Sequence, residues 1–248
     1  MRARVLLLRG YLDKAAAEAH LCLADAEVSG SRLALCYAIR NGVCPIDLAR
    51  GDFDGAMRAA DRLGTLAEEY GLTFWLDWCS CLRGQIQVAR GEHAVGVAPL
   101  LAGLARRQQN GWRMRNPEFQ TSLAQGLAQL GRIGEAMDLL TAAASECEGN
   151  DQRWCLPEVR RCMAEVLMLD PTRGADAWQL LVRAASEARA GGALLFELRS
   201  TLSLHRLGQT LGRAETTRRD LLDVLDRFSE GHDTPQLAAA RETLSRGA

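Results

Sequence analysis

Glycine recurs along this chain at a nearly constant interval. The break positions lie 41, 40, 40, 41 and 40 residues apart, and all but one are glycine: Gly10, Gly51, Gly91, Gly131, Thr172 and Gly212. Five residues after each break lies a small side chain: Ala15, Ala56, Gly96, Ala136, Ala177 and Thr217. A fixed interval of this length is typical of stacked-repeat proteins, in which each repeat covers its neighbour's apolar face.

Within one repeat, the apolar pattern predicts two helices separated by a break. In the second repeat, Val43, Ile46 and Ala49 form a stripe of helical spacing before Gly51. Apolar residues then recur at steps of three and four over residues 53–67. Glycine suits the left-handed turn that ends a helix. Strand signals are nearly absent, with 5% aromatic residues, so we expect an all-α fold.

The regular spacing of the small residues along the chain has a packing explanation. Each lies in the first turn of the second helix of its repeat, where we expect the two helices of a hairpin to come closest. Close helix packing favours alanine or glycine at such a point. At Thr172 the break differs, because the preceding Pro171 stops the first helix in another way.

The two ends of the chain differ from its middle. Only nine residues precede Gly10, so the first repeat lacks most of its leading helix, and we expect a truncated or partner-completed start. Near the other end, Thr234 suits an N-cap and Pro235 suits the first helical turn. We therefore predict a single α-solenoid over residues 1–248 that closes with a capping helix at 234–246.

The repeats resemble the tetratricopeptide repeat (TPR), which places a glycine near the helix turn and an alanine five residues later. The segments Gly51–Ala56 and Gly131–Ala136 fit that pattern well. The usual repeat has about 34 residues, so the longer interval here adds roughly one helical turn. The resemblance implies a right-handed, TPR-like α-solenoid of helical hairpins.

The lengthened repeat is similar to the C-terminal tails of large bacterial signalling proteins. In these, an adenylate cyclase or winged-helix DNA-binding domain precedes a STAND-type ATPase and the repeats. The segments 157–160, 197–199 and 228–231 look like the last two repeats of such tails. The resemblance implies a sensing or regulatory role in signal transduction or transcription regulation, with an upstream ATPase or DNA-binding domain of the same polypeptide as a partner.

The net charge and the hydropathy of the chain limit the classes of partner that it can bind. The net charge is −1, so no global field attracts nucleic acid or an anionic membrane. No stretch approaches the roughly 20 apolar residues of a membrane helix. We expect a cytoplasmic protein with no direct nucleic-acid or membrane contact, whose cysteines behave as small buried hydrophobes.

Motifs for catalysis and metal binding are absent from the sequence. Lys14 is not preceded by the glycine run of a P-loop, and no HExxH or GxSxG motif occurs. Cys79 and Cys81 would point about 200° apart on a helix, which does not favour chelation. Cys155 and Cys162 could share a helix face, but no further ligand is spaced to suit them. The histidines are scattered: His20, His93, His205 and His232. We expect no catalytic residue, no cofactor and no metal.

The TPR register predicts which side chains face a concave surface. Positions seven apart on the first helices would face it, and the candidates for partner binding are Trp78, Gln85, Glu118, Gln125, Arg199 and Arg206. For Trp78, packing in the core is the alternative. A second candidate is an anion patch around Gly111, formed by Arg106, Arg107, Arg113 and Arg115. The alternative for these arginines is stabilisation of a helix C-terminus.

The sequence favours a non-catalytic helical repeat scaffold that binds a protein, a peptide or a small effector within a bacterial regulatory system. One alternative is a structural spacer or oligomerisation arm. Another is an enzyme that uses the concave surface as an active site, which would require perturbed ionisable residues in a deep pocket. A DNA-binding module is disfavoured by the near-neutral charge.

Overall fold

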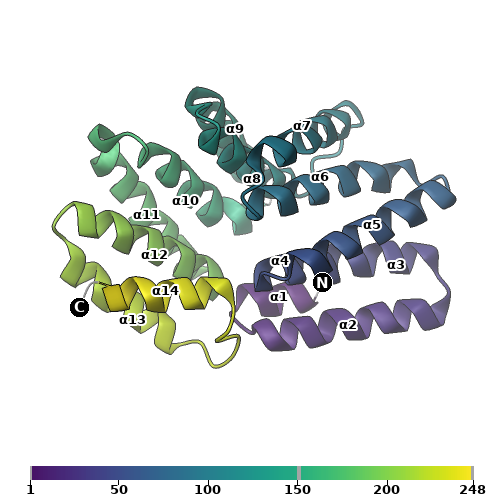
Figure 1. The fold of residues 1–248 in the computed structure, drawn as a ribbon, viewed down its shortest axis with the longest axis horizontal. Coiled ribbons are helices and arrows are strands. Elements are labelled where there is room, and N and C mark those ends of the chain that lie inside the picture. Colours follow the sequence, from purple (N-terminus) through teal and green to yellow (C-terminus); the bar gives the residue numbers. More distant parts are fainter. Residues whose placement is uncertain (1, 150–151, 247–248) are drawn as a thin grey trace. The chain divides into compact units, whose positions relative to one another are not determined.

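The computed structural model describes residues 2–149 and 152–246, and all regular structure in these ranges is helical (Figure 1). This confirms the all-α prediction for the described residues. The α-helices are α1 (Arg2–Leu8), α2 (Leu12–Ser29), α3 (Arg32–Ala38), α4 (Cys44–Arg50), α5 (Phe53–Glu69), α6 (Thr73–Ala89), α7 (His93–Gln109), α8 (Asn116–Gln129), α9 (Ile133–Gly149), α10 (Leu156–Leu167), α11 (Gly174–Ala190), α12 (Leu194–Thr210), α13 (Ala214–Asp226) and α14 (Pro235–Arg246). Shorter segments are the π-helix η1 (Ile39–Val43) and the 3₁₀ helices η2 (Arg153–Cys155) and η3 (Pro171–Arg173).

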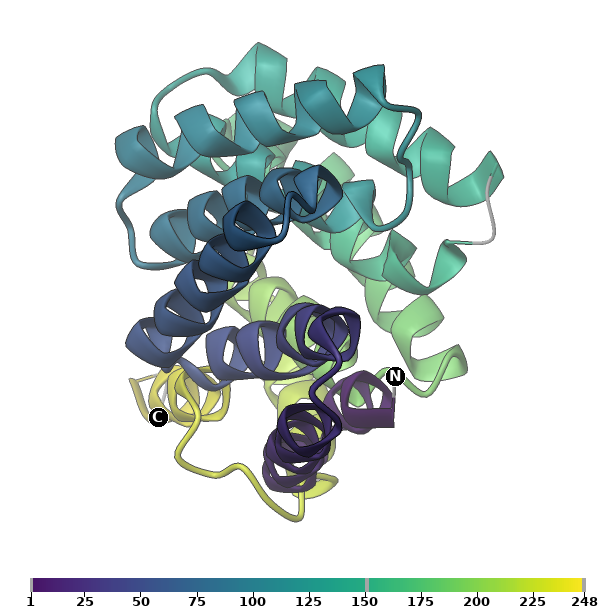
Figure 2. The ribbon, with the colours of Figure 1, turned by 90° about the vertical axis from the view of Figure 1, so that its right-hand side faces the viewer.

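The chain divides into two compact units. Unit 1 contains the residues up to Leu7 together with Leu12–Arg132, and unit 2 contains Leu8–Tyr11 together with the residues from Ile133 onward. Within each unit, consecutive helices pack side by side in a solenoid-like arrangement, as α6 and α7 do in unit 1 and α11 and α12 in unit 2 (Figures 1 and 2). A single continuous solenoid over residues 1–248 stays a prediction.

Glycines with a left-handed backbone follow several of the helices. The φ angles of Gly51, Gly91, Gly131 and Gly212 are 82°, 88°, 77° and 69°. Glycine adopts this conformation without the steric clash that a Cβ atom would cause. The break near Thr172 differs, because α10 already ends at Leu167 and Pro171 begins the 3₁₀ helix η3.

The small residues of the repeat pattern lie at close helix contacts. Each is the fourth residue of its helix and is buried: Ala15, Ala56, Gly96, Ala136, Ala177 and Thr217. At one such contact, the backbones of α6 and α7 approach each other closely. A Cβ atom added to Gly96 would lie 2.7 Å from the carbonyl oxygen of Gly84, and one added to Gly84 would lie 2.6 Å from that of Gly96. The two backbones therefore touch directly, and only glycine fits at these positions.

Helices α3 and α4 are joined without a break by the π-helical segment η1. Pro45, near the start of α4, lacks an N–H group, and a proline ring clashes with the carbonyl four residues earlier in an α-helix. That carbonyl belongs to Asn41, which lies within η1. A widened π turn accommodates such a conflict. The same turn carries Arg40, whose side chain is buried.

Helix α14 covers α12 and α13 of unit 2 with an apolar stripe. Its buried residues Leu237, Ala240 and Leu244 match the stripe expected for the predicted capping helix. At the expected N-cap, the Thr234 hydroxyl instead donates a hydrogen bond to the carbonyl oxygen of Gly231, at 2.7 Å.

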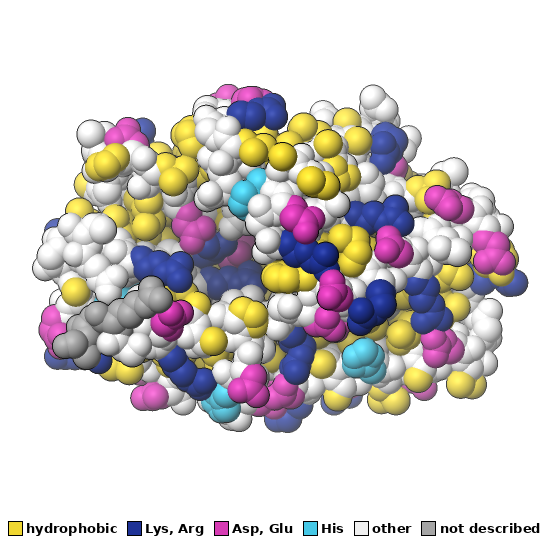
Figure 3. Space-filling view, viewed as in Figure 1, with side chains coloured by type: hydrophobic (Ala, Val, Ile, Leu, Met, Phe, Trp, Pro, Cys, Tyr) yellow, Lys and Arg dark blue, Asp and Glu magenta, His cyan; other side chains and the backbone are white. Residues whose placement is uncertain are grey.

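The molecular surface mixes charges of both signs. On the face shown in Figure 3, arginine and acidic side chains alternate with apolar ones, in keeping with the net charge of −1. None of the helices in the described ranges combines the length and the apolar character needed to cross a lipid bilayer.

Candidate functional site

Buried arginines surround Trp78 in the interior of unit 1. Trp78 lies on α6 and is 1% exposed, and its ring also packs edge-on against Phe119. The guanidinium carbons of Arg40 and Arg107 lie 3.7 Å and 4.0 Å from its ring centre, and that of Arg115 lies at 5.5 Å. Contacts of this kind are favourable cation–π interactions. We define the arginine cluster as Trp78 and Glu118 together with Arg4, Arg40, Arg107 and Arg115.

The arginines of the cluster come from segments far apart in the sequence. Arg4 lies on α1, Arg40 on η1 and Arg107 in the last turn of α7. Arg115 immediately precedes α8 and has a φ of 62°, the one positive value at a non-glycine position in the described ranges. A left-handed backbone costs such a residue roughly 1–2 kcal/mol. The rest of the site must therefore stabilise the buried position of this side chain.

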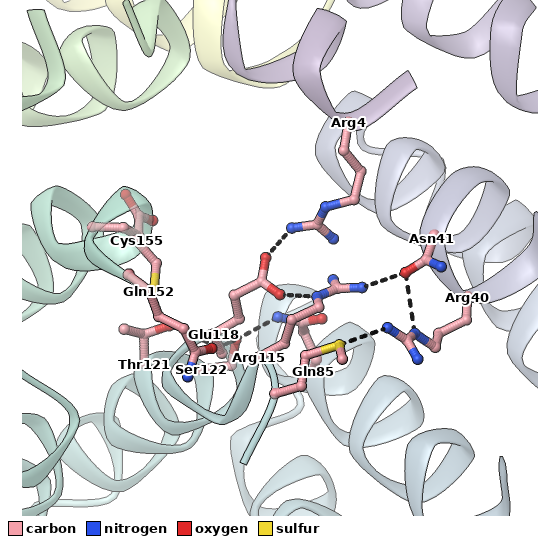
Figure 4. A network of polar contacts seen from close by, with 12 residues as sticks. Arg4, Arg40, Asn41, Gln85, Arg115, Glu118, Thr121, Ser122, Gln152 and Cys155 are labelled. Atoms are coloured by element: carbon pink, nitrogen blue, oxygen red, sulfur yellow. Dashed lines mark hydrogen bonds and ion pairs between the residues drawn. The ribbon is translucent and has the colours of Figure 1, made fainter. Parts of the chain in front are cut away.

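Glu118 is the carboxylate of the cluster. It accepts hydrogen bonds from Nη2 of Arg4 and from Nε of Arg115 (Figure 4). Burial alone would raise the pKa of Glu118, but the neighbouring guanidinium groups of Arg115 and Arg4 outweigh it and lower that pKa. Glu118 is therefore ionised at neutral pH and holds two of the arginines in place.

Arg40 differs from the other arginines of the cluster in its partners. Its Nε donates to Oδ1 of Asn41 at 3.1 Å, and its Nη2 approaches the Met114 sulfur at 3.6 Å. The same Asn41 oxygen accepts a hydrogen bond from Nη1 of Arg115 at 3.2 Å. A guanidinium group has five N–H donors and no acceptor. Within the described ranges, Arg40 forms no ion pair and donates to one oxygen atom.

The electrostatic environment of Arg40 is strongly positive. Burial, followed by the positive charges of Arg115, Arg107 and Arg4, lowers the pKa of Arg40 to about 9. The guanidinium is still charged at neutral pH. An anion placed beside it would relieve this repulsion and satisfy its N–H donors, because charge-assisted hydrogen bonds are stronger in a buried setting.

Arg107 fixes the connection between α7 and α8. Its Nε donates to Oδ1 of Asn116 at 2.9 Å, and its Nη2 donates to the carbonyl oxygen of Met114 at 2.6 Å. Asn116 in turn donates to the carbonyl oxygen of Trp112 at 3.0 Å. These bonds shape the loop that presents Arg115 to the cluster.

The polar interior continues along α8 next to the cluster. Nε2 of Gln85, on α6, donates to Oγ of Ser122 at 2.9 Å. The hydroxyl groups of Ser122 and Thr121 both donate to the carbonyl oxygen of Glu118, at 3.3 Å and 2.7 Å. In contrast, Nε1 of Trp78 is buried and has no hydrogen-bond partner among the described residues. Polar side chains and the Trp78 N–H thus lie beside a cationic centre, which is an arrangement suited to binding an oxyanion.

The structure brings together only part of the partner-binding set predicted from the sequence. Trp78, Gln85 and Glu118 meet at or beside the cluster, and Gln125 lies half-buried one turn further along α8 than Ser122. Trp78 is a core residue, as the alternative interpretation proposed. The other two predicted residues lie on α12 in unit 2, where Arg199 pairs with Glu158 at 3.0 Å and Arg206 is exposed.

The predicted anion patch is divided in a similar way. Arg107 and Arg115 belong to the cluster, whereas Arg113 is exposed in the connection between α7 and α8. Arg106, with 47% of its side chain exposed, pairs with Asp77 at 2.6 Å. Sequence reasoning missed Arg4 and Arg40. The one available signal was Pro45, because a proline inside a predicted helix marks an irregular turn.

One buried polar network of unit 2 consists of paired side chains. Glu158 on α10 accepts hydrogen bonds from Arg161 and Arg199, and Arg161 also pairs with Glu165 at 2.5 Å. The Ser203 hydroxyl donates to Glu165 at 2.6 Å. Opposite charges balance within this network, which distinguishes it from the surroundings of Arg40.

A cavity of about 280 Å³ also opens on unit 1. Its ionisable lining residues are His20, Asp47, Asp52, Arg58 and Arg62. Burial and the nearby charge of Asp52 raise the pKa of Asp47. Asp52 accepts a hydrogen bond from the Gly55 N–H at 2.8 Å as the N-cap of α5, and Arg62 pairs with Glu27 at 2.7 Å. These contacts are structural, and we regard the cavity as secondary to the arginine cluster.

Most cysteine side chains, and His205 among the histidines, are part of the core. Apart from the exposed Cys22, the cysteines are buried. His205 is 2% exposed and its Nδ1 lies 2.9 Å from the Thr217 hydroxyl. Within residues 2–149 and 152–246, no group of three or more side chains is placed to hold a metal ion.

Comparison with known proteins yields a structural neighbour and no family. No family model matches the chain, and no curated protein matches it. Among solved structures, the crystal structure of BtubC (BKLC) from P. vanneervenii is similar, with a TM-score of 0.60 and 14% sequence identity. The similarity covers 87% of this chain and 90% of that one, which shows a shared helical fold.

Proposed function

We propose that this protein is a non-catalytic binding scaffold whose arginine cluster receives an acidic group of a protein or peptide partner, or of a small effector. The observation that carries the proposal is the environment of Arg40. This cation is 4% exposed, lies among other cations and donates to one amide oxygen among the described residues.

The geometry around Asn41 supports recognition of an oxyanion. One oxygen atom lies within 3.1 Å of Arg40 Nε and 3.2 Å of Arg115 Nη1. A carboxylate or phosphate oxygen has the same reach and adds a negative charge. Planar guanidinium groups bind such anions with two parallel hydrogen bonds, which favours arginine over lysine at these sites.

Trp78 and Glu118 support the site from within the protein. The Trp78 ring holds the guanidinium groups of Arg40 and Arg107 by cation–π contacts, and Glu118 positions Arg4 and Arg115. Side chains that are fixed before binding lose less conformational entropy when a partner arrives.

The wider context of the proposal comes from the resemblance to TPR proteins. We propose right-handed, TPR-like hairpins with a repeat of about forty residues, capped by α14. Support comes from the buried small residue at the fourth position of α2, α5, α7, α9, α11 and α13 and from the left-handed glycines between helices. We further propose a sensing role in the cytoplasm of a bacterium, coupled to an ATPase or DNA-binding domain of the same polypeptide.

Titration calorimetry on the full chain tests the binding proposal. The probes are a glutamate-rich peptide and a lysine-rich peptide of equal length. We expect the acidic peptide to bind and Arg40→Met to weaken it at least tenfold, because a hydrogen-bonded charge contributes about 1.5–3 kcal/mol. Arg219→Met, which removes an exposed arginine outside the predicted binding residues, is the matched control. Equal affinity of wild-type protein and Arg40→Met would refute the role of the cluster.

A further inference from the structure

Two buried thiols face each other in unit 2. The sulfur atoms of Cys147, near the end of α9, and Cys155, at the end of η2, lie 3.4 Å apart. The two residues are 0% and 2% exposed. Bonded sulfur atoms in a disulfide are about 2.05 Å apart, so small side-chain rotations would bring this pair to bonding distance.

The surroundings of Cys147 favour its thiolate form. Its contact with the Cys155 thiol lowers the pKa of Cys147 and outweighs burial, and the positive charge of Arg160 acts in the same direction. Glu146 and Glu148 oppose this effect. The thiolate is the nucleophilic form of cysteine, so a lowered pKa favours reaction.

Other buried thiols of the chain show the opposite behaviour. Burial raises the pKa of Cys79 and of Cys81 to about 12. The Cys155 thiol also approaches the carbonyl oxygen of Gln152, at 3.0 Å, which holds the sulfur of Cys155 beside that of Cys147. The pair is therefore distinct in both geometry and environment.

We propose that Cys147 and Cys155 form an oxidation-sensitive dithiol that closes to a disulfide when the protein meets hydrogen peroxide. The Cys147 thiolate attacks one peroxide oxygen and becomes a sulfenic acid, and the leaving hydroxide takes up a proton to form water. The Cys155 sulfur then attacks the sulfenic sulfur, and a second water leaves. Peroxide is reduced, the two thiols are oxidised, and the two thiol hydrogens end in water.

The disulfide would join two segments that already share an ion-pair network. Arg160 on α10 pairs with Glu148 on α9 at 2.9 Å and with Glu187 on α11 at 2.5 Å. Because η2 leads directly into α10, oxidation would link α9 covalently to the start of α10. The modification thus fixes the packing of consecutive helices in unit 2, and it does not depend on the proposed anion site.

Peroxide treatment of the full chain tests this assignment. The parent variant is Cys22→Ser, which removes the exposed thiol and with it disulfides between molecules. We expect the intact mass to fall by two hydrogen atoms, and peptide mapping to find Cys147 joined to Cys155. In Cys155→Ser, dimedone should trap the sulfenic acid at Cys147. Cys162→Ser, which removes another buried thiol, should still form the disulfide.

Peptide mapping of the Cys22→Ser parent variant tests the proposed disulfide directly, whether or not Cys155→Ser folds. If peroxide leaves Cys147 and Cys155 reduced while circular dichroism shows an intact fold, the proposal is wrong. It is equally wrong if the linkage forms only after denaturation, because the native contact would then have no role.

Discussion

The guanidinium carbon of Arg40 lies 3.7 Å from the centre of the Trp78 ring. Aromatic rings attract a desolvated cation by about 2 kcal/mol, which is less than the loss of hydration for a buried charge. The positive field of Arg115, Arg107 and Arg4 adds to that loss. Arg40 is therefore held in a position where an anion would be strongly favoured.

Replacing Arg40 by methionine should separate ligand binding from folding. Methionine keeps the apolar contact with Trp78 and removes a charge that burial disfavours, so we expect the free energy of unfolding to change by less than about 1 kcal/mol. Sulfate should raise the Tm of wild-type protein more than that of Arg40→Met. The comparison uses thermal melts over a sulfate series, with Arg219→Met correcting for the general salt effect. Parallel sulfate responses in all three proteins would contradict the prediction.

Replacing Glu118 by glutamine should weaken folding and strengthen anion binding. The change leaves Arg4 and Arg115 without their shared carboxylate, and removing one partner of a buried ion pair costs about 3 kcal/mol. It also removes a negative charge that repels an incoming anion, so affinity for the acidic peptide should rise at least threefold. Urea unfolding and calorimetry measure the two effects. Glu69→Gln, at an exposed position, is the control. A Glu118→Gln variant that is as stable as wild-type protein and binds the acidic peptide with unchanged affinity would refute both predictions.

Glu158 should make the stability of the protein sensitive to acid. Burial raises its pKa, but Arg161 and Arg199 outweigh burial and lower the pKa to about 2. A carboxyl group with a lowered folded-state pKa stabilises the fold fully above its unfolded pKa of about 4.3, and this contribution is lost as the pH falls toward 2.

The comparison with Glu158→Gln isolates that contribution. Between pH 5 and pH 2, wild-type protein should lose on the order of 3 kcal/mol more unfolding free energy than the variant, which cannot titrate at this position. Urea unfolding at a series of pH values measures the difference. Identical pH profiles for the two proteins would show that the ion pairs of Glu158 do not contribute to stability.

Two glycine-to-alanine substitutions should have effects of opposite sign. A methyl group on Gly96 would lie 2.7 Å from the Gly84 carbonyl oxygen and 2.8 Å from the Val88 nitrogen, so α6 and α7 must separate. We expect a loss of about 2–3 kcal/mol. Gly134, on α9, has no atom within 4 Å of such a methyl group, and alanine there should stabilise the helix by up to about 1 kcal/mol. Urea unfolding distinguishes the two, and losses of equal size would contradict this account.

Local rules were sufficient to predict the helices and several of their contacts. Glycine tolerates the left-handed turn after α4 and α6, and a small residue is needed where two helices touch, so Gly51, Gly91 and Gly96 are readable from the sequence. These requirements involve residues that are close in the chain. The C-terminal end of α10 was harder to predict, because the helix already ends at Leu167, before Pro171.

The site was only partly predictable, since its residues converge through tertiary structure. Arg4 and Glu118 are 114 positions apart and meet only when unit 1 is folded. Arg106 and Arg107 are neighbours in the sequence, yet successive helical side chains point about 100° apart, so one reaches Asp77 and the other reaches Trp78. No local sequence pattern predicts which of the two arginines is exposed and which is buried.

The π turn at Ile39–Val43 gives the arginine cluster an unusual genetic vulnerability. A π turn arises when one residue is inserted into an α-helix, and deleting that residue restores the regular helix. Removal of a single codon here would rotate the preceding segment by about 100° relative to α4 and move Arg40 away from Trp78. A lineage could thus lose this contact in one mutational step, although the deletion would return Pro45 to a regular α-helix, where its ring clashes with the carbonyl four residues earlier.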